Sequence, residues 1–297
     1  MSSSNPCSQF ADAVYRDTGA VIEPIPDGKV HRFDDPEGRQ GNLAGWYVLH
    51  LDGHPAGAYG SWRSGYQGTW RLDCDQKPAP AEKARVQASW KAARERRERE
   101  LAKAQAQAAK RAKSRWESAQ PATVEHPYLA RKQIPALGLR QQGPLLLVPL
   151  LTVDGDLVNV QQIYADGSKR FLKGGRITGC FALVGRQIPE TGTVYVCEGW
   201  ATAMTIHVKT RATVVAAMSA VNLKPVAQAL RKLRPGLDLI LAADYDHRTP
   251  GNPGMRHATE AARAVGGGVI SPLVCGGENC LCVDFNDLAV CDRRAAQ

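Results

Sequence analysis

The sequence has few features of membrane or secreted proteins. Its 297 residues contain no apolar run of about 18 residues, the length that a membrane-spanning helix requires. The N-terminal segment also lacks the basic stretch followed by an apolar stretch that is typical of a signal peptide. We therefore expect a cytoplasmic protein without membrane contact, whose eight cysteines are mostly reduced thiols rather than disulfides.

Two nucleotide- and metal-binding motifs are also missing. No Walker A motif occurs, which argues against a fused helicase motor. The first 77 residues contain Cys7, Cys74 and three histidines but no Cys-x-x-Cys pair, so a zinc ribbon is not expected there.

Glycine and proline are both absent between residues 81 and 118, which predicts one long, exposed helix. Residues 82–117 carry twelve basic and five acidic side chains, and the whole chain has a formal net charge of +9. Trp90, Leu101 and Trp116 are too sparse for a coiled-coil seam. The helix is therefore either a solvated spacer or a spacer that also contacts nucleic-acid phosphates.

Composition divides the chain into four parts. Residues 1–77 predict a small β-rich domain, residues 78–119 a basic helical linker, residues 120–190 a mixed α+β subdomain, and residues 191–297 an α/β domain. In the first part, Trp46, Trp62 and Trp70 could form a face on which single-stranded DNA bases stack, or they could fill the core of the domain.

The last part alternates strand and helix patterns, which predicts a parallel, doubly wound sheet flanked by helices. In such sheets, ligands bind beyond the carboxyl ends of the strands. Glu198 follows the apolar strand at 194–197, and Asp244 and Asp246 follow the one at 237–242. Asp284 and Asp287 lie in a later turn. We expect these carboxylates to converge.

Clustered carboxylates raise one another's pKa unless cations lie among them. A hard divalent metal is the simplest cation, and Mg²⁺ is usually held by one or two carboxylates together with waters and substrate phosphates. This arrangement suits nucleotidyl transfer or phosphodiester cleavage.

A basic, glycine-containing stretch precedes the α/β domain. Its four cations, Lys169, Arg170, Lys173 and Arg176, surround two glycines, and this composition suits a loop that approaches a phosphate-bearing ligand. We expect these cations, together with Lys132, to bind the phosphates of such a ligand.

Several motifs resemble known families. Residues 196–203 (VCEGWATA) resemble the glutamate motif of Toprim domains, and residues 243–246 (ADYD), followed by Gly254 and Ala258, resemble their Asp-x-Asp motif. The motifs HPYL at 126–129 and DFNDL at 284–288, with the basic stretch at 169–175, resemble the catalytic part of primases carried by plasmids and phages.

The resemblance implies a DNA primase that joins ribonucleoside triphosphates on a single-stranded DNA template. It implies catalysis by Glu198, Asp244 and Asp246 with Mg²⁺ or Mn²⁺, with Asp284 and Asp287 as further metal ligands. It also implies that nucleotide or template binds the basic residues Lys132, Lys169, Arg170, Lys173 and Arg176. A replicative helicase or a single-strand-binding protein would be a partner. A Toprim nuclease and a non-catalytic DNA-binding module remain alternatives, because the same acidic set can cleave phosphodiesters.

A cysteine cluster near the C-terminus raises the question of zinc. Cys275, Cys280, Cys282 and Cys291 lie close in the sequence, but their spacing is not that of a common structural zinc site. Free thiols are the alternative to a zinc site here.

Overall fold

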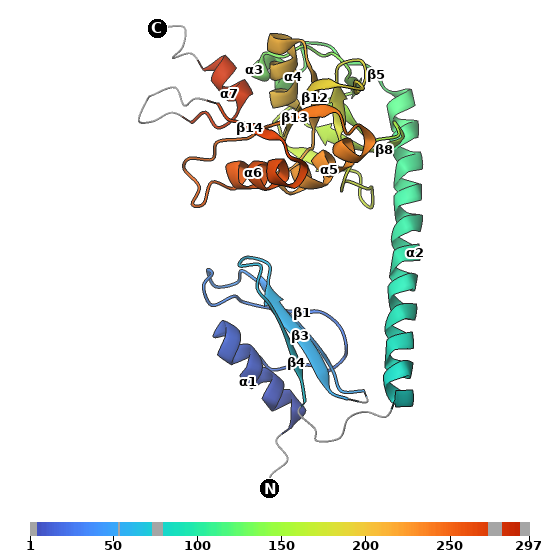
Figure 1. The fold of residues 1–297 in the computed structure, drawn as a ribbon, viewed down its shortest axis with the longest axis vertical. Helices are drawn as coiled ribbons and strands as arrows, with labels where there is room; N and C mark the ends of the chain where they lie inside the picture. Colours follow the sequence, from blue (N-terminus) through green and yellow to red (C-terminus); the bar gives the residue numbers. More distant parts are fainter. Residues whose placement is uncertain (1–4, 53, 73–79, 273–280, 292–297) are drawn as a thin grey trace. The chain divides into compact units, whose positions relative to one another are not determined.

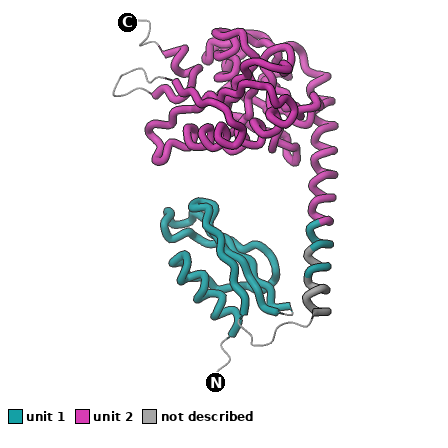
Figure 2. Tube along the Cα trace, viewed as in Figure 1, with its two compact units in different colours: residues 1–94 teal, residues 95–297 magenta. Residues whose placement is uncertain are grey.

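A computed structural model describes residues 5–52, 54–72, 80–272 and 281–291. The chain forms two compact units, residues 1–94 and residues 95–297 (Figure 2). Within the described part of the chain, no helix combines the length and the apolar character that a bilayer span requires.

The first unit is a four-stranded antiparallel sheet with one helix, α1 (Pro6–Thr18), packed on it. The strands follow chain order: β1 (His31–Phe33), β2 (Gly45–His50), β3 (Ala56–Ser61) and β4 (Gln67–Arg71). Side chains alternate between two faces, so Tyr47, Leu49 and Tyr59 pack against Phe10 of α1. These strands agree with the β-rich character expected of this part of the chain.

A 39-residue helix, α2 (Pro80–Ser118), follows, as the absence of glycine and proline predicted.

The second unit contains two five-stranded sheets (Figure 1). One is antiparallel, in the order β5-β6-β7-β8-β9. Its elements are β5 (Gln120–Pro121), α3 (Pro127–Lys132), β6 (Arg140–Gln142), β7 (Leu145–Leu151), β8 (Leu157–Ile163) and β9 (Lys169–Phe171).

The other sheet has the order β10-β12-β11-β13-β14 and is parallel except for its edge strand β10. Its elements are β10 (Ala182–Val184), β11 (Gly192–Cys197), α4 (Trp200–Thr210), β12 (Thr213–Ala216), a 3-10 turn (Ala220–Asn222), α5 (Leu223–Leu233), β13 (Leu237–Ala242), α6 (Pro253–Val265), β14 (Gly268–Ile270) and α7 (Phe285–Val290). The α/β fold expected from the alternating pattern is confirmed.

Two apolar cores cover the two faces of the parallel sheet. Val194, Val196 and Leu239 face α5 and α6 on one side. On the other side, Ala216 and Ala242 belong to a core that also contains α4, α3 and the antiparallel sheet. The antiparallel sheet therefore packs on the parallel sheet through a shared core. This packing gives β9 a fixed position relative to the carboxyl ends of the parallel strands.

Candidate active site

Two neighbouring strands bring Glu198 and Asp244 to one edge of the parallel sheet. In β11 and β13, Cys197 lies opposite Ala242, so both strands end at the same level. Glu198 and Asp244 follow these ends, and the charge of Glu198 raises the pKa of Asp244. The expected convergence of carboxylates at the strand ends is therefore present in the fold.

Asp244 lies at the centre of this cluster. Burial, followed by the charges of Glu198 and Asp284, raises the pKa of Asp244 from 3.8 to about 8. Its Oδ1 atom is buried and has no hydrogen-bond partner among the described residues. A buried, unpaired acceptor is costly. A divalent cation would satisfy this oxygen and would favour the ionised carboxylate, so the residues present fit a metal.

Asp246 is fixed by the start of α6. Its Oδ2 atom accepts a hydrogen bond from the Gly254 amide at 2.8 Å, and its own amide donates to Oδ1 of Asn252 at 2.9 Å. Asn252 also caps α6. A Cβ atom at residue 254 would lie 2.6 Å from the Asp244 carbonyl oxygen and 3.0 Å from Oδ2 of Asp246. The loop that carries both aspartates therefore requires glycine at this position.

Glu198 is partly buried between the Asp-x-Asp loop and the turn that follows β12. Burial and the charge of Asp246 raise the pKa of Glu198, whereas Lys169 and a backbone hydrogen bond at Ala220 lower it. The Met218 amide donates to the Glu198 carbonyl at 2.7 Å, which ties this turn to the end of β11.

Lys169 on β9 faces the carboxylates from the antiparallel sheet. Lys169 itself is exposed. Partial desolvation and the charge of Lys132 lower the pKa of Lys169, and Asp284, Glu198 and Asp244 oppose this shift. The site therefore combines a carboxylate cluster with a facing ammonium group, which suits a ligand that has phosphates and a metal.

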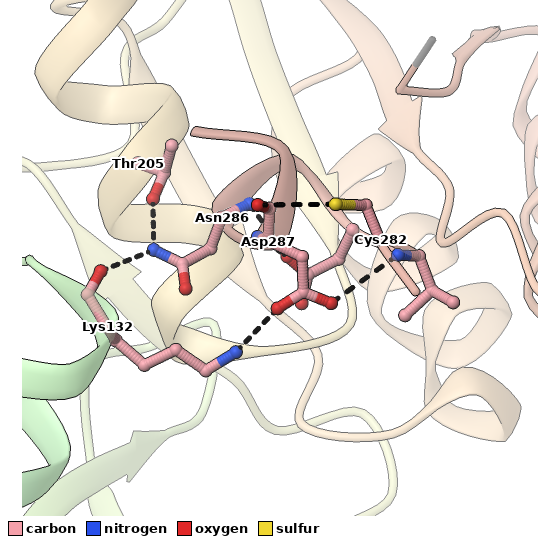
Figure 3. Close-up of polar contacts among 7 residues, drawn as sticks. Lys132, Thr205, Cys282, Asn286 and Asp287 are labelled. Atoms are coloured by element: carbon pink, nitrogen blue, oxygen red, sulfur yellow. Dashed lines mark hydrogen bonds and ion pairs between the residues drawn. The ribbon is translucent and has the colours of Figure 1, made fainter. Parts of the chain in front are cut away.

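Lys132 and Asp287, both predicted to bind ligands, bind each other (Figure 3). The Lys132 ammonium lies 2.8 Å from Oδ1 of Asp287. Beside this pair, the amide of Asn286 donates to the Lys132 carbonyl at 2.8 Å and to the Thr205 hydroxyl at 2.9 Å. These bonds fasten α7 to α3 and α4, so we assign the two residues a positioning role.

The bonds of Asn286 and Asp287 to Lys132 and Thr205 form a clamp that holds α7. Asp284 caps this helix. Its Oδ1 atom accepts the amides of Asn286 and Asp287, each at 2.7 Å. Its charge also raises the pKa of Asp244 and of Glu198. The clamp therefore fixes a third carboxylate next to the strand-end pair.

The three other predicted cations have contacts outside the carboxylate cluster. The guanidinium of Arg170 lies 5.8 Å from the ring centroid of Tyr164, and the guanidinium of Arg176 donates to the Thr178 carbonyl. The Lys173 carbonyl accepts a hydrogen bond from Arg111 of α2. Of the four cations in the basic stretch, Lys169 is the one whose charge acts on the carboxylates, because neighbouring residues of β9 point to opposite sides.

Tyr128 is a further residue of the site, which the sequence alone does not indicate. Its hydroxyl is buried without a hydrogen-bond partner, and Lys169 Nζ lies 5.7 Å from its ring centroid. Burial and the charge of Asp284 raise its pKa to about 12. The HPYL motif contained this residue, but nothing local in the sequence indicates that a tyrosine after a helix cap will reach a distant carboxylate.

No group of three or more His, Cys, Asp or Glu side chains in the described residues could hold a metal ion on its own. In the possible zinc cluster, Cys275 and Cys280 lie outside the described residues, and the Cys282 thiol donates to the Asp287 carbonyl at 3.6 Å.

In the first unit, two of the three predicted stacking residues come together. Trp46 and Trp62 have ring centroids 5.7 Å apart, and the Arg32 guanidinium lies 3.9 Å from the Trp62 ring centroid. Trp70 instead packs against Phe10 of α1, at 5.6 Å, in the core of this unit.

Comparison with known proteins places this site in a family context. The model of the Toprim domain matches residues 193–293. Two sequences of DNA primase TraC from Escherichia coli are 37% and 34% identical to this chain over 92% of its length. The chain spans only 27% and 20% of those two proteins.

Solved primase structures are also similar in part. The primase fragment of the bacteriophage T7 primase-helicase protein has a TM-score of 0.43 and 18% identity, covering 57% of this chain and 72% of that one. The DnaG catalytic core has a TM-score of 0.34 and 16% identity, covering 49% of this chain and 48% of that one. From the family match and the TraC relatives, the chain contains a Toprim domain at residues 193–293, within a longer region that is homologous to part of the TraC DNA primases.

Proposed function

We propose that this chain is the catalytic region of a DNA primase, which joins ribonucleoside triphosphates on a single-stranded DNA template. The observation that carries the proposal is the position of Lys169 on a separate sheet, from which its charge interacts with the carboxylates of Glu198 and Asp244. A carboxylate cluster alone suits either synthesis or cleavage of a phosphodiester, whereas a facing cation provides a place for the triphosphate of an incoming nucleotide. The homology to part of the TraC primases supports the same reaction.

In this proposal, Glu198 and Asp244 hold a divalent metal, Mg²⁺ or Mn²⁺. When bound, the metal neutralises charge that develops on the transferred phosphoryl group and its leaving pyrophosphate. Asp246 keeps one oxygen on the Gly254 amide and offers the other to the site. Asp284 adds negative charge that strengthens cation binding.

Lys169 would orient the triphosphate by a charge-assisted contact. Partial desolvation lowers the pKa of Lys169, but the residue is exposed, so its ammonium group is accessible to an anionic ligand. Tyr128 lies under Lys169 with an unpaired hydroxyl, so we assign it the role of supporting this lysine.

The alternatives are a Toprim nuclease and a DNA-binding module without catalysis. Incubation of the protein with circular single-stranded DNA, labelled ribonucleotides and Mg²⁺ or Mn²⁺ separates them in one experiment. We expect short, ribonuclease-sensitive, alkali-labile products and intact circles. Linearised or shortened DNA without such products would identify a nuclease. DNA that is bound but neither copied nor cleaved would identify a DNA-binding module without catalysis.

A further inference from the structure

The C-terminal part of α2 is mounted on the second unit rather than being a free spacer (Figure 1). Ala108 and Ala112 on its inner face are fully buried. The Arg140 guanidinium donates to the carbonyl of Trp116 at 2.7 Å and lies 5.1 Å from the ring centroid of that residue. This part of α2 therefore has a fixed position relative to the sheets of the unit.

A groove of about 530 Å³ lies between this part of α2 and the ends of β6 and β9. Its polar lining comprises Lys110, Arg111, Ser114, Arg115, Ser118 and Gln142. Leu172 is the other lining residue, and none of the described residues that line the groove has a carboxylate. Each polar lining side chain can donate a hydrogen bond, and three of them are cations, so the groove is suited to an anion with several oxygen atoms.

Two of these cations are held in place by neighbouring groups. The Arg111 guanidinium donates to the Lys173 carbonyl at 2.8 Å, and the Arg115 guanidinium donates to Oε1 of Gln162 at 2.6 Å. Each guanidinium has further N–H groups that these bonds do not use. Because the two side chains are already ordered, a ligand would immobilise them at little additional entropic cost.

We propose that this groove binds the phosphodiester backbone of the single-stranded DNA template. The groove contains no aromatic side chain for base stacking, so it would hold phosphates without reading sequence. Leu172 in its wall follows β9 directly, and β9 carries Lys169 to the carboxylates. A DNA strand in the groove would therefore lie beside the end of β9, the β-strand that carries Lys169 of the candidate active site. The inference rests on the proposed function, because the template is the polyanion that a primase must hold.

Equilibrium binding of a fluorescent single-stranded oligonucleotide to the full chain tests the groove. The double variant Lys110→Gln/Arg111→Gln removes two lining cations. The matched control Lys103→Gln/Lys113→Gln removes two cations of the same helix that do not line the groove. We expect binding about tenfold weaker for the groove variant at low salt. We also expect its log–log salt dependence to be shallower by roughly 1.4, because each lost phosphate contact contributes about 0.7. The control should bind like the wild type.

A second groove variant leaves the hydrogen bonds of Arg111 and Arg115 in place. Ser114→Glu places a carboxylate in the groove, and Ala106→Glu places one at an exposed position outside it. Only Ser114→Glu should weaken binding. If groove and control variants lost equal affinity for the oligonucleotide, net charge alone would explain binding and the inference would be overturned. Wild-type affinity in both groove variants would also overturn it. Because binding is read without synthesis, a chain that binds through the groove but makes no primers would refute the proposed function and leave the groove assignment standing.

Discussion

Asp244 is the residue at which stability and proposed function conflict most directly. Its pKa of about 8 in the folded chain, against 3.8 ordinarily, means that its ionisation opposes folding. The penalty is absent below about pH 4, grows as the pH rises through the interval between these values, and is complete above pH 8. A bound divalent cation would remove the penalty by favouring the charged form.

The first prediction follows from this conflict. We expect Asp244→Asn to raise the melting temperature of the metal-free protein by at least about 2 °C at pH 8.5, which corresponds to roughly 1 kcal/mol for a unit of this size. The difference should shrink towards pH 4. Thermal unfolding in a chelator measures it, and Asp238→Asn, at an exposed position near the start of the same strand, is the control. A lower melting temperature for Asp244→Asn at pH 8.5 would contradict the assignment.

The second prediction concerns Gly254, which has no functional group. Alanine at this position would press on the Asp244 carbonyl and on the Asp246 carboxylate and so move both aspartates. We expect Gly254→Ala to reduce primer synthesis at least tenfold while all the carboxylates remain. Gly268→Ala is the control, because a Cβ atom there meets no atom within 4 Å. Wild-type synthesis by Gly254→Ala would show that the loop can shift without consequence.

Among the elements, α7 depends most on distant partners. Its six residues are too few for a stable helix in isolation. Asp284 caps it, and the bonds of Asn286 and Asp287 hold it on α3 and α4 (Figure 3). The position of the Asp284 carboxylate is therefore set by side chains from two other helices.

The third prediction tests this clamp. We expect Asn286→Ala to lower the free energy of unfolding by about 1–3 kcal/mol, because the Lys132 carbonyl and the Thr205 hydroxyl lose their donor in a buried region. Synthesis should fall as well, since Asp284 is released. Denaturant unfolding gives the first quantity. Thr205→Ser, which keeps the acceptor hydroxyl, should be close to wild type, and an unchanged stability in Asn286→Ala would mean that α7 is held by other contacts.

The elements also show what the sequence alone could reveal. The strands that end at Glu198 and Asp244 were predictable, because apolar runs alternate with amphipathic helices and both acids directly follow such a run. The Lys132–Asp287 pair was not, because its members are 155 residues apart and no local pattern records their contact. Lys169 was grouped with Arg170, although neighbouring residues of a strand face opposite sides. A prediction that residues 169–171 form a strand would place Lys169 and Arg170 on opposite faces of the sheet.

For the whole molecule, the position of α2 decides where the catalytic region begins. The second compact unit starts at residue 95, and the buried alanines of α2 and the bonds of Arg140 belong to it. A boundary at residue 120 would remove these contacts and leave the Arg140 guanidinium without its carbonyl partners. We therefore propose a boundary close to residue 95.

The fourth prediction compares two truncations. We expect residues 95–297 to unfold cooperatively near the melting temperature of the same unit in the full chain. Residues 120–297 should be less stable by at least about 2 kcal/mol, because apolar surface becomes exposed and the partly buried Arg140 guanidinium loses its carbonyl partners. Circular dichroism melting curves of both fragments decide the point. Equal melting temperatures would mean that α2 contributes nothing to the core.

The central claim is that the carboxylates at the ends of β11 and β13 act together in nucleotidyl transfer. The most direct measurement is the rate of dinucleotide formation on a saturating single-stranded DNA template in Mg²⁺ or Mn²⁺, for the wild type, Asp244→Asn and Asp238→Asn. Loss of metal stabilisation of the transferred phosphoryl group should slow Asp244→Asn by at least about 10²-fold, with template affinity within twofold of the wild type. Asp238→Asn should match the wild type. Dinucleotide formation by Asp244→Asn at the wild-type rate would contradict the account.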